Sequence, residues 1–132
     1  MANFAILNHN DQVISIEYIE NSVLIDNNGI EKEINGINYI LSLRPDLKAN
    51  QIIQVSANGN FRGGLPDIGS YYIRSEDGFA ERKNPPYPSW KLNKLYHKWE
   101  SPQKLRENIV NPIWDENKKE WKDIDKNSRI SL

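Results

Sequence analysis

The chain has 132 residues, a formal net charge of −1 and no cysteine. This length fits one folded domain, and the lack of cysteine excludes disulfides and thiolate metal sites. The near-neutral charge gives no electrostatic reason to expect nucleic acid as a partner. We also expect no membrane helix, because no apolar run approaches the ~18 residues required, and no signal peptide, because the first residues lack a basic region and a long apolar region.

Charge is distributed unevenly along the chain. Acidic residues outnumber basic ones before residue 81, and basic residues outnumber acidic ones after it. This pattern fits a basic face that meets an acidic partner. It also fits chance spacing of solvated charges, which is the simpler interpretation and the one we favour.

The first predicted elements are two strands that form an N-terminal hairpin. Asn3–Leu7 is a short apolar run, and Val13–Ile19 is rich in β-branched and aromatic residues. Residues 8–11 between them are Asn, His, Asn and Asp, which favour a turn. A further short extended segment is predicted at Ser22–Ile25.

One amphipathic helix is predicted after a turn at Asp26–Gly29. Its apolar face consists of four residues at helical spacing, namely Ile30, Ile34, Ile37 and Leu41, with Ile40 adjacent. Gly36 should cost this helix about 1 kcal/mol relative to alanine. The helix should end at Arg44, because the following Pro45 disfavours helical backbone in the residue before it.

A buried strand at Gln51–Val55 leads into a long turn-rich loop, Ser56–Gly69, which holds four of the seven glycines. A loop of this length inside a compact domain is often functional. Its segment Asn58–Gly64 exposes backbone N–H groups, as phosphate loops do, but lacks their lysine and hydroxyl. We therefore expect a shaped loop in which Arg62 forms a structural or interfacial ion pair.

Aromatic residues then bracket a polar turn three times, in Tyr71–Ala80, Trp90–Trp99 and Trp114–Trp121. The pattern predicts three β-hairpins whose facing aromatic residues form cross-strand pairs. In the first turn, Gly78 is predicted to supply the positive φ. The proline-rich segment Asn84–Ser89 predicts an extended connector that cannot donate to a sheet.

The predicted fold class is β-rich α+β, with an N-terminal hairpin, one amphipathic helix and an antiparallel meander of aromatic hairpins. Residues Pro102–Val110 are spaced for one or two helical turns. We expect a single domain over residues 1–126, with a strand and helix half at 1–80, tryptophan-bracketed hairpins at 81–126, and a flexible tail at 127–132.

The tryptophan pairs fit three interpretations. They can form the hydrophobic core of the hairpins, a surface for a partner protein, or a platform that stacks on a glycan. The sequence favours the core and leaves the other two open.

No motif predicts catalysis. The two histidines, His9 and His97, have no metal-ligand spacing, and we expect His97 on a hairpin strand. Asp115 and Glu116 are expected in a turn, where a paired-carboxylate site would lack fixed geometry. A Gly-x-Ser-x-Gly motif and cysteine nucleophiles are both absent. We expect no enzyme activity, cofactor or metal.

Several short motifs occur in an order that resembles a known group of proteins. They are Asn3–Leu7, Asn58–Arg62, Ile68–Gly69 with Tyr71–Tyr72, Pro86–Leu92, Trp99–Pro102, and Trp114–Glu116 with Trp121. This set is similar to small uncharacterised proteins of marine tailed bacteriophages, those of cyanobacteria and related ocean bacteria. The chain departs from that pattern at Ala57, where a tyrosine is expected, and at Gln103–Asn111, where a shorter proline-rich link is expected. The resemblance implies a phage origin and a virion-associated role on the head, neck or tail, and supplies no catalytic residues.

The expected function is that of a phage virion structural accessory protein, a capsid decoration or a neck or tail subunit. It would be made in the host cytoplasm and bind other phage structural proteins, with no nucleic acid or membrane partner. The alternatives are a tail-fibre assembly chaperone and a module that recognises a host glycan. The residues expected to contact the partner are Asn58, Phe61, Arg62, Tyr87, Trp90, Trp99, Trp114 and Trp121.

Overall fold

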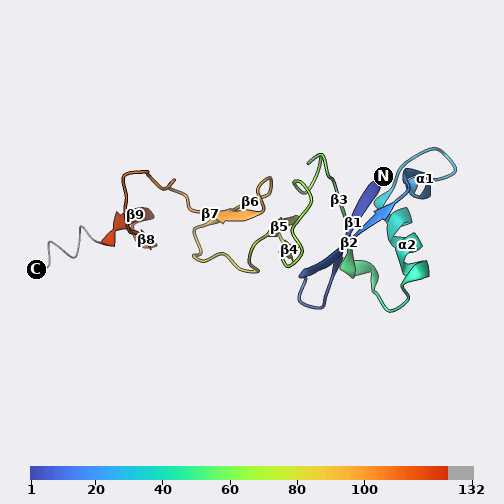
Figure 1. The fold of residues 1–132 in the computed structure, drawn as a ribbon, viewed down its shortest axis with the longest axis horizontal. Helices are drawn as coiled ribbons and strands as arrows, with labels where there is room; N and C mark the ends of the chain where they lie inside the picture. Colours follow the sequence, from blue (N-terminus) through green and yellow to red (C-terminus); the bar gives the residue numbers. More distant parts are fainter. Residues whose placement is uncertain (125–132) are drawn as a thin grey trace, which may run out of the picture.

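A computed structural model describes residues 1–124 and shows an elongated α+β protein with an N-terminal body at one end (Figure 1). The predicted fold class is confirmed. The helices are α1 (Asn21–Leu24) and α2 (Glu33–Leu43), and a 3-10 turn lies at Ala49–Gln51. The strands are β1 (Ala2–Leu7), β2 (Val13–Ile19), β3 (Ile52–Val55), β4 (Tyr71–Ile73), β5 (Gly78–Ala80), β6 (Lys91–Asn93), β7 (Lys98–Glu100), β8 (Pro112–Asp115) and β9 (Glu120–Asp123).

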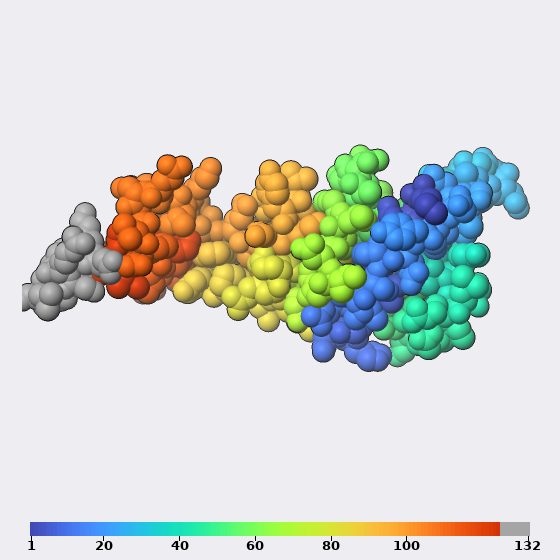
Figure 2. Space-filling view, viewed as in Figure 1, coloured from blue at the N-terminus to red at the C-terminus, as the bar shows by residue number. Residues whose placement is uncertain are grey.

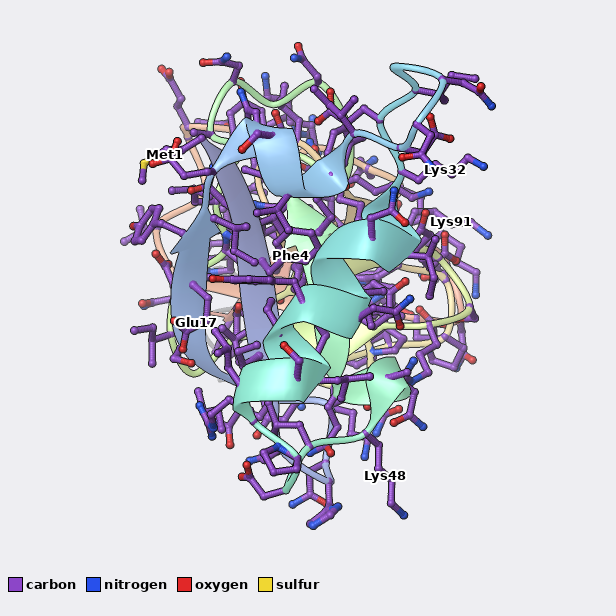
Figure 3. The ribbon with its side chains drawn as sticks, turned by 90° about the vertical axis from the view of Figure 1, so that its right-hand side faces the viewer. Met1, Phe4, Glu17, Lys32, Lys48 and Lys91 are labelled. Atoms are coloured by element: carbon purple, nitrogen blue, oxygen red, sulfur yellow. The ribbon has the colours of Figure 1, made fainter. Side chains whose placement is uncertain are left out.

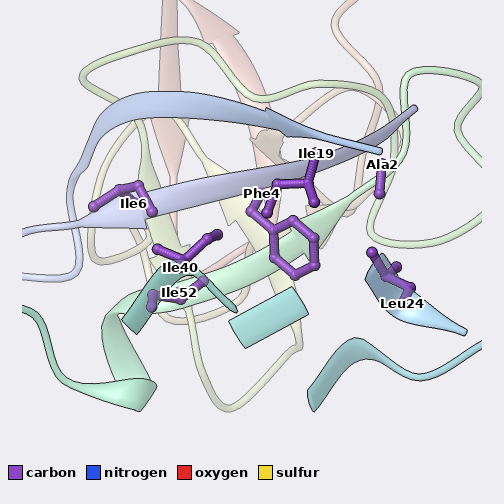
Figure 4. Close-up of a cluster of buried hydrophobic side chains, with 7 residues drawn as sticks. All are labelled: Ala2, Phe4, Ile6, Ile19, Leu24, Ile40 and Ile52. Atoms are coloured by element: carbon purple, nitrogen blue, oxygen red, sulfur yellow. The ribbon is translucent and has the colours of Figure 1, made fainter. Parts of the chain in front are cut away.

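The body is an antiparallel sheet of order β2-β1-β3 with α2 against one face. Phe4 is fully buried and lies between the sheet and the helix (Figure 3). The cluster around it gathers apolar residues from both strands and helices (Figure 4): Ala2, Phe4, Ile6, Ile19, Leu24, Ile40 and Ile52. The predicted N-terminal hairpin and the strand near residues 51–55 are therefore confirmed.

The helix differs from its prediction at its start and on its buried face. It begins at Glu33 rather than Ile30, and Ile30 and Ile34 are about half exposed, whereas Ile37, Ile40 and Leu41 pack on the core as predicted. Gly36 is no weak point: a Cβ there would overlap the Phe4 ring, so glycine permits the close approach of helix and sheet. The end after Leu43 agrees with the prediction.

The opposite face of the sheet is covered by the hairpin β4–β5. Alternate residues of β1 point to this side, and the second buried cluster contains Ala5, Leu7, Val13, Ile53, Val55, Tyr72 and Phe79. The Val13 N–H donates to the Ser70 carbonyl at 2.8 Å, and the Tyr72 N–H donates to the Asp11 carbonyl at 2.8 Å. The first aromatic hairpin thus belongs to the folded body.

The three predicted hairpins are present and share one geometry. Within residues 1–124 they form separate two-stranded sheets that follow one another away from the body (Figure 1). Their central cross-strand pairs are Tyr72 with Phe79, Leu92 with Trp99, and Trp114 with Trp121. In each hairpin the last turn residue has a positive φ: Asp77 (50°), His97 (58°) and Lys119 (56°).

Several local predictions were wrong. The positive φ expected at Gly78 belongs to Asp77, and the space at Gly78 is taken by side chains of the second hairpin. The extended segment expected at Ser22–Ile25 is mostly the short helix α1, and Pro102–Val110 contains no helix. Trp90 lies outside β6, so the cross-strand partner of Trp99 is Leu92. The tail predicted at 127–132 lies outside the described residues.

No helix within residues 1–124 is long and apolar enough to span a membrane.

Candidate partner-binding surface

Arg62 holds the long loop 56–69 onto the body. Its guanidinium donates to the Glu33 carboxylate at the start of α2 (2.8 Å) and to the Asp77 carboxylate in the first hairpin turn (2.8 Å). It also donates to the Gln54 carbonyl of β3 at 2.7 Å, and its side chain is only 17% exposed. The predicted structural ion pair of Arg62 is confirmed, and it joins helix, sheet, loop and hairpin.

The pKa values around this network favour its charged form. A hydrogen bond from the Tyr72 hydroxyl, together with Arg62, lowers the pKa of Asp77. Burial and the neighbouring Asp77 raise the pKa of Tyr72 to about 12. Partial burial alone would lower the pKa of Arg62, but its bonds to Glu33 and Asp77 outweigh that effect and raise it. These shifts stabilise the charged forms of Arg62 and Asp77 and the neutral form of Tyr72.

The same side chains cover the outer edge of β3. The Gln54 N–H donates to the Glu33 carboxylate at 2.7 Å, and the Gln54 carbonyl accepts from Arg62. β3 lies at one end of the sheet order, where open backbone groups would otherwise invite another strand. This edge is therefore protected against pairing with a second chain at Gln54.

Two of the predicted contact residues are accessible on the loop. Asn58 and Phe61 are exposed, and they help to line a shallow polar cleft of about 220 Å³ between the loop and the start of β1. Phe61 keeps 42% of its surface exposed although Arg62 beside it is held inside the molecule. The loop thus presents an aromatic side chain to solvent next to its anchored residue Arg62.

The second and third hairpins, after residue 80, are here called the hairpin array. Three of the four tryptophans pack together at the end of this array that is farther from the body. Trp90 contacts Trp114 and Trp121, with ring centroids 5.8 Å apart in each case, and Trp114 and Trp121 are 5.4 Å apart. Tyr87 packs on Trp90 at 5.8 Å. Trp114 is buried and the other three rings are half-buried. These aromatic residues form the small core of the third hairpin, as the favoured interpretation expected.

Glu116 joins this cluster to the proline-rich connector. Its carboxylate accepts hydrogen bonds from the Ser89 N–H (3.1 Å), the Ser89 hydroxyl (2.6 Å) and the Trp114 indole (2.8 Å). The bonds from Ser89 and Trp114 lower the pKa of Glu116 to about 2. Of the two residues predicted in this turn, Glu116 lies there and binds the connector, whereas Asp115 is the last residue of β8.

Hydrogen bonds from two tryptophans join each hairpin of the array to the one before it, which the sequence did not predict. The Trp99 indole donates to the Arg82 carbonyl at 2.9 Å, and its backbone N–H donates to the Glu81 carboxylate. The Trp121 indole donates to the Gln103 carbonyl at 3.0 Å, and its backbone N–H donates to the Gln103 side chain. In both cases a tryptophan on the second strand binds the segment that follows the preceding hairpin.

The turn of the second hairpin carries exposed apolar residues that sequence analysis missed. Leu95 is 60% exposed and Tyr96 is 67% exposed. The equivalent positions of the other hairpins are polar: Ser75 and Glu76 in the first, and Asn117 and Lys118 in the third. The sequence signal that could have identified Leu95 and Tyr96 is this contrast between apolar and polar turn residues. It is visible only when the three hairpins are aligned by their turns.

The loop 56–69 packs against the base of that turn. The His97 imidazole lies 3.0 Å from the Gly64 carbonyl and meets the Phe79 ring edge-on. A Cβ at Gly63 would collide with the Lys94 carbonyl, so glycine is required for this contact. His97 was expected on a strand, but it lies in the turn and points inward. The loop and the turn protrude on the same side of the molecule (Figure 2).

The described residues offer no cluster of three or more histidine or acidic side chains that could hold a metal ion. Comparison with protein-family models, curated proteins and solved structures finds no match to this chain. Contact of the predicted residues with a partner stays a prediction. Among them, Asn58 and Phe61 are exposed, whereas Arg62 is half-buried in its ion pairs and Trp114 is buried.

Proposed function

We propose that the protein is a structural accessory protein of a tailed-phage particle, a capsid decoration or a neck or tail subunit that acts by binding other phage structural proteins. The observation that carries this proposal is the exposed pair Leu95 and Tyr96 beside the loop that presents Phe61. Large apolar groups gathered on one side of a stable scaffold are typical of a protein-binding surface. The ordered motifs similar to marine phage proteins supply the phage context.

The packing of the tryptophans supports protein binding over glycan binding. A sugar-stacking platform needs an open aromatic face, whereas Trp90, Trp114 and Trp121 direct their rings at one another. Trp99 is half-buried and its indole is bound to Arg82. The exposed aromatic residues are instead single tyrosine and phenylalanine side chains, namely Tyr18 on β2, Tyr39 on α2, Phe61 on the loop and Tyr96 in the second turn.

A tail-fibre assembly chaperone would use the same contacts transiently. Consecutive short hairpins with the exposed Leu95 and Tyr96 at one turn also fit a protein that binds another protein during assembly and then dissociates. The two functions differ in one observable, which is whether the protein remains in the finished particle.

Mass spectrometry of purified particles of the encoding phage tests the proposal. We expect the protein in the particle, and its copy number relative to the major capsid protein separates the sites. A high, symmetric number indicates a decoration or shell subunit, and a low number indicates the neck or tail. Absence from the particle would overturn the proposal, and absence together with loss of infectivity on gene deletion would favour the chaperone.

A further inference from the structure

We infer that the turn Lys94–Lys98, here called the second-hairpin tip, docks into an apolar pocket with an acidic rim on a phage structural protein. The inference rests on the proposed function and names the contact by which the chain would hold its partner. It is carried by the exposure, the rigidity and the charge of the tip.

The fold does not require the apolar residues of the tip. Leu95 and Tyr96 are mostly exposed, and the same turn geometry is built with polar residues in the first and third hairpins. Their apolar surface therefore contributes little to folding, but its burial would stabilise a complex. Tyrosine is also among the residues most often found at the energetic centre of protein interfaces.

The tip is held in one shape before any partner arrives. The Asn93 side-chain oxygen accepts the N–H groups of Leu95 and Tyr96 at 3.1 and 3.2 Å. Its amide donates to Glu100 at 2.8 Å across the hairpin. His97 fixes the base of the tip against the loop. A preordered tip loses less conformational entropy on binding, which raises affinity.

The charge of the tip selects an acidic partner. Lys94 and Lys98 flank the apolar pair, and both are exposed. Neither forms an ion pair with any residue in the described part of the chain, although the charge of Lys94 helps to lower the pKa of the nearby Asp77. The third hairpin behaves differently. Its Lys119 pairs with Glu116 at 3.4 Å, and its Lys122 pairs with Asp115 at 2.7 Å.

An acidic rim around an apolar pocket would complement both features of the tip. Opposite charges at the rim of an interface raise the association rate and select the partner. The exposed apolar pair between the lysines favours a protein pocket over nucleic acid, because a phosphate backbone offers charge but no apolar surface to bury Leu95 and Tyr96.

The test uses particles of the encoding phage prepared without this protein, to which the purified full chain is added back and measured by co-sedimentation. We expect saturable loading of the wild-type chain. The double substitution Leu95→Ser with Tyr96→Ser should weaken loading by at least about 30-fold, the loss typical of removing a central apolar anchor. Leu95→Met with Tyr96→Phe keeps the apolar surface and should stay within about threefold of the wild type.

A matched control changes the same two turn positions in the third hairpin. Asn117→Ser with Lys118→Ser should load like the wild type. Lys94→Glu with Lys98→Glu should weaken loading, and higher salt should weaken wild-type loading because it screens the same charges. Unchanged circular dichroism and melting temperature establish that each variant is folded. If the serine variant does not fold, the inference is tested by the loading of the Lys94→Glu with Lys98→Glu variant. Loading equal to the wild type would then overturn it.

The outcomes separate this inference from the proposed function. If the wild type loads and a folded serine variant loads equally well, the tip is not the contact and only this inference is overturned. Loss of loading in the third-hairpin control would also overturn it. If the wild type does not load, the proposed function is overturned as well. Binding to phage DNA that the glutamate variant abolishes would replace the acidic protein pocket with nucleic acid.

Discussion

The body and the hairpin array are stabilised in different ways. In the body, a three-stranded sheet has buried apolar clusters on both faces, one under α2 and one under the first hairpin. In the array after residue 80, Trp114 is the only hydrophobic residue among those described that is buried. The array relies instead on half-buried aromatic rings, and two of its indoles, those of Trp99 and Trp121, bind neighbouring backbone.

This difference follows from the size of the elements. A hairpin with three or four residues in each strand exposes too much backbone and buries too little apolar surface to be stable alone. Phenylalanine suits the body, because Phe4 and Phe79 have no polar atom to satisfy inside a core. Tryptophan suits the array at Trp99 and Trp121, since the ring packs while its N–H reaches a carbonyl at the margin.

Removal of the Phe4 side chain should give the largest effect. Phe4→Ala leaves a cavity between the sheet and α2, and we expect the free energy of unfolding of the body to fall by about 3–5 kcal/mol. Urea denaturation followed by circular dichroism measures this loss. Phe61→Ala is the control, because Phe61 is 42% exposed and its loss should cost less than about 0.5 kcal/mol. Equal losses would contradict the location of the core.

Loss of the Arg62 network should be the next largest effect. Arg62→Met leaves Glu33 and Asp77 without their cation, and we expect a destabilisation of about 1–3 kcal/mol by urea denaturation. Arg74→Met removes a more exposed ion pair to Asp11 and a hydrogen bond to the Asn50 carbonyl, and should cost less than the loss of Arg62 because these contacts are closer to solvent. A larger effect at Arg74 would mean that the loop is not held by Arg62.

Removal of a single indole N–H should have a smaller and local effect. Trp99→Phe keeps an aromatic ring but loses the bond to the Arg82 carbonyl, which we expect to cost the second hairpin about 1 kcal/mol. Amide hydrogen exchange should show faster exchange in β6 and β7 with no change in β1. Faster exchange throughout the chain would contradict the separation of array and body.

Acid should loosen the third hairpin by a modest amount. The pKa of Glu116 is about 2 in the folded protein against an ordinary value of 4.5, so its stabilising effect is complete above pH 4.5 and is lost as the pH falls toward 2. Tryptophan fluorescence during acid titration should report this change. Glu116→Gln should remove it, and a titration unchanged by that substitution would show that Glu116 does not hold Ser89.

The hairpins could be predicted from sequence because their signals are local. Polar turns between aromatic residues fix the strands, and the apolar runs at Asn3–Leu7 and Gln51–Val55 sufficed for the body. The role of Gly36 depends on Phe4, which is far away in the sequence but adjacent in space. No local pattern contains that contact, so the glycine was interpreted as a cost to the helix.

The candidate surface was only partly predictable for the same reason. The loop with Asn58 and Phe61 was identified by its glycines and its length, and both residues are exposed. The packing of Trp90 on Trp114 joins different elements, so sequence analysis assigned Trp90 to the wrong partner. Tyr96 was missed because one hairpin read alone gives no reason to single out its turn.

Hydrogen exchange of each amide in the intact chain tests the difference between body and array most directly. We predict that β1 and β3 exchange only through global unfolding, whereas β8 and β9 exchange through local opening at a lower free energy. Equal protection in both regions, lost together in denaturant, would contradict this result and would mean that body and array form one cooperative unit.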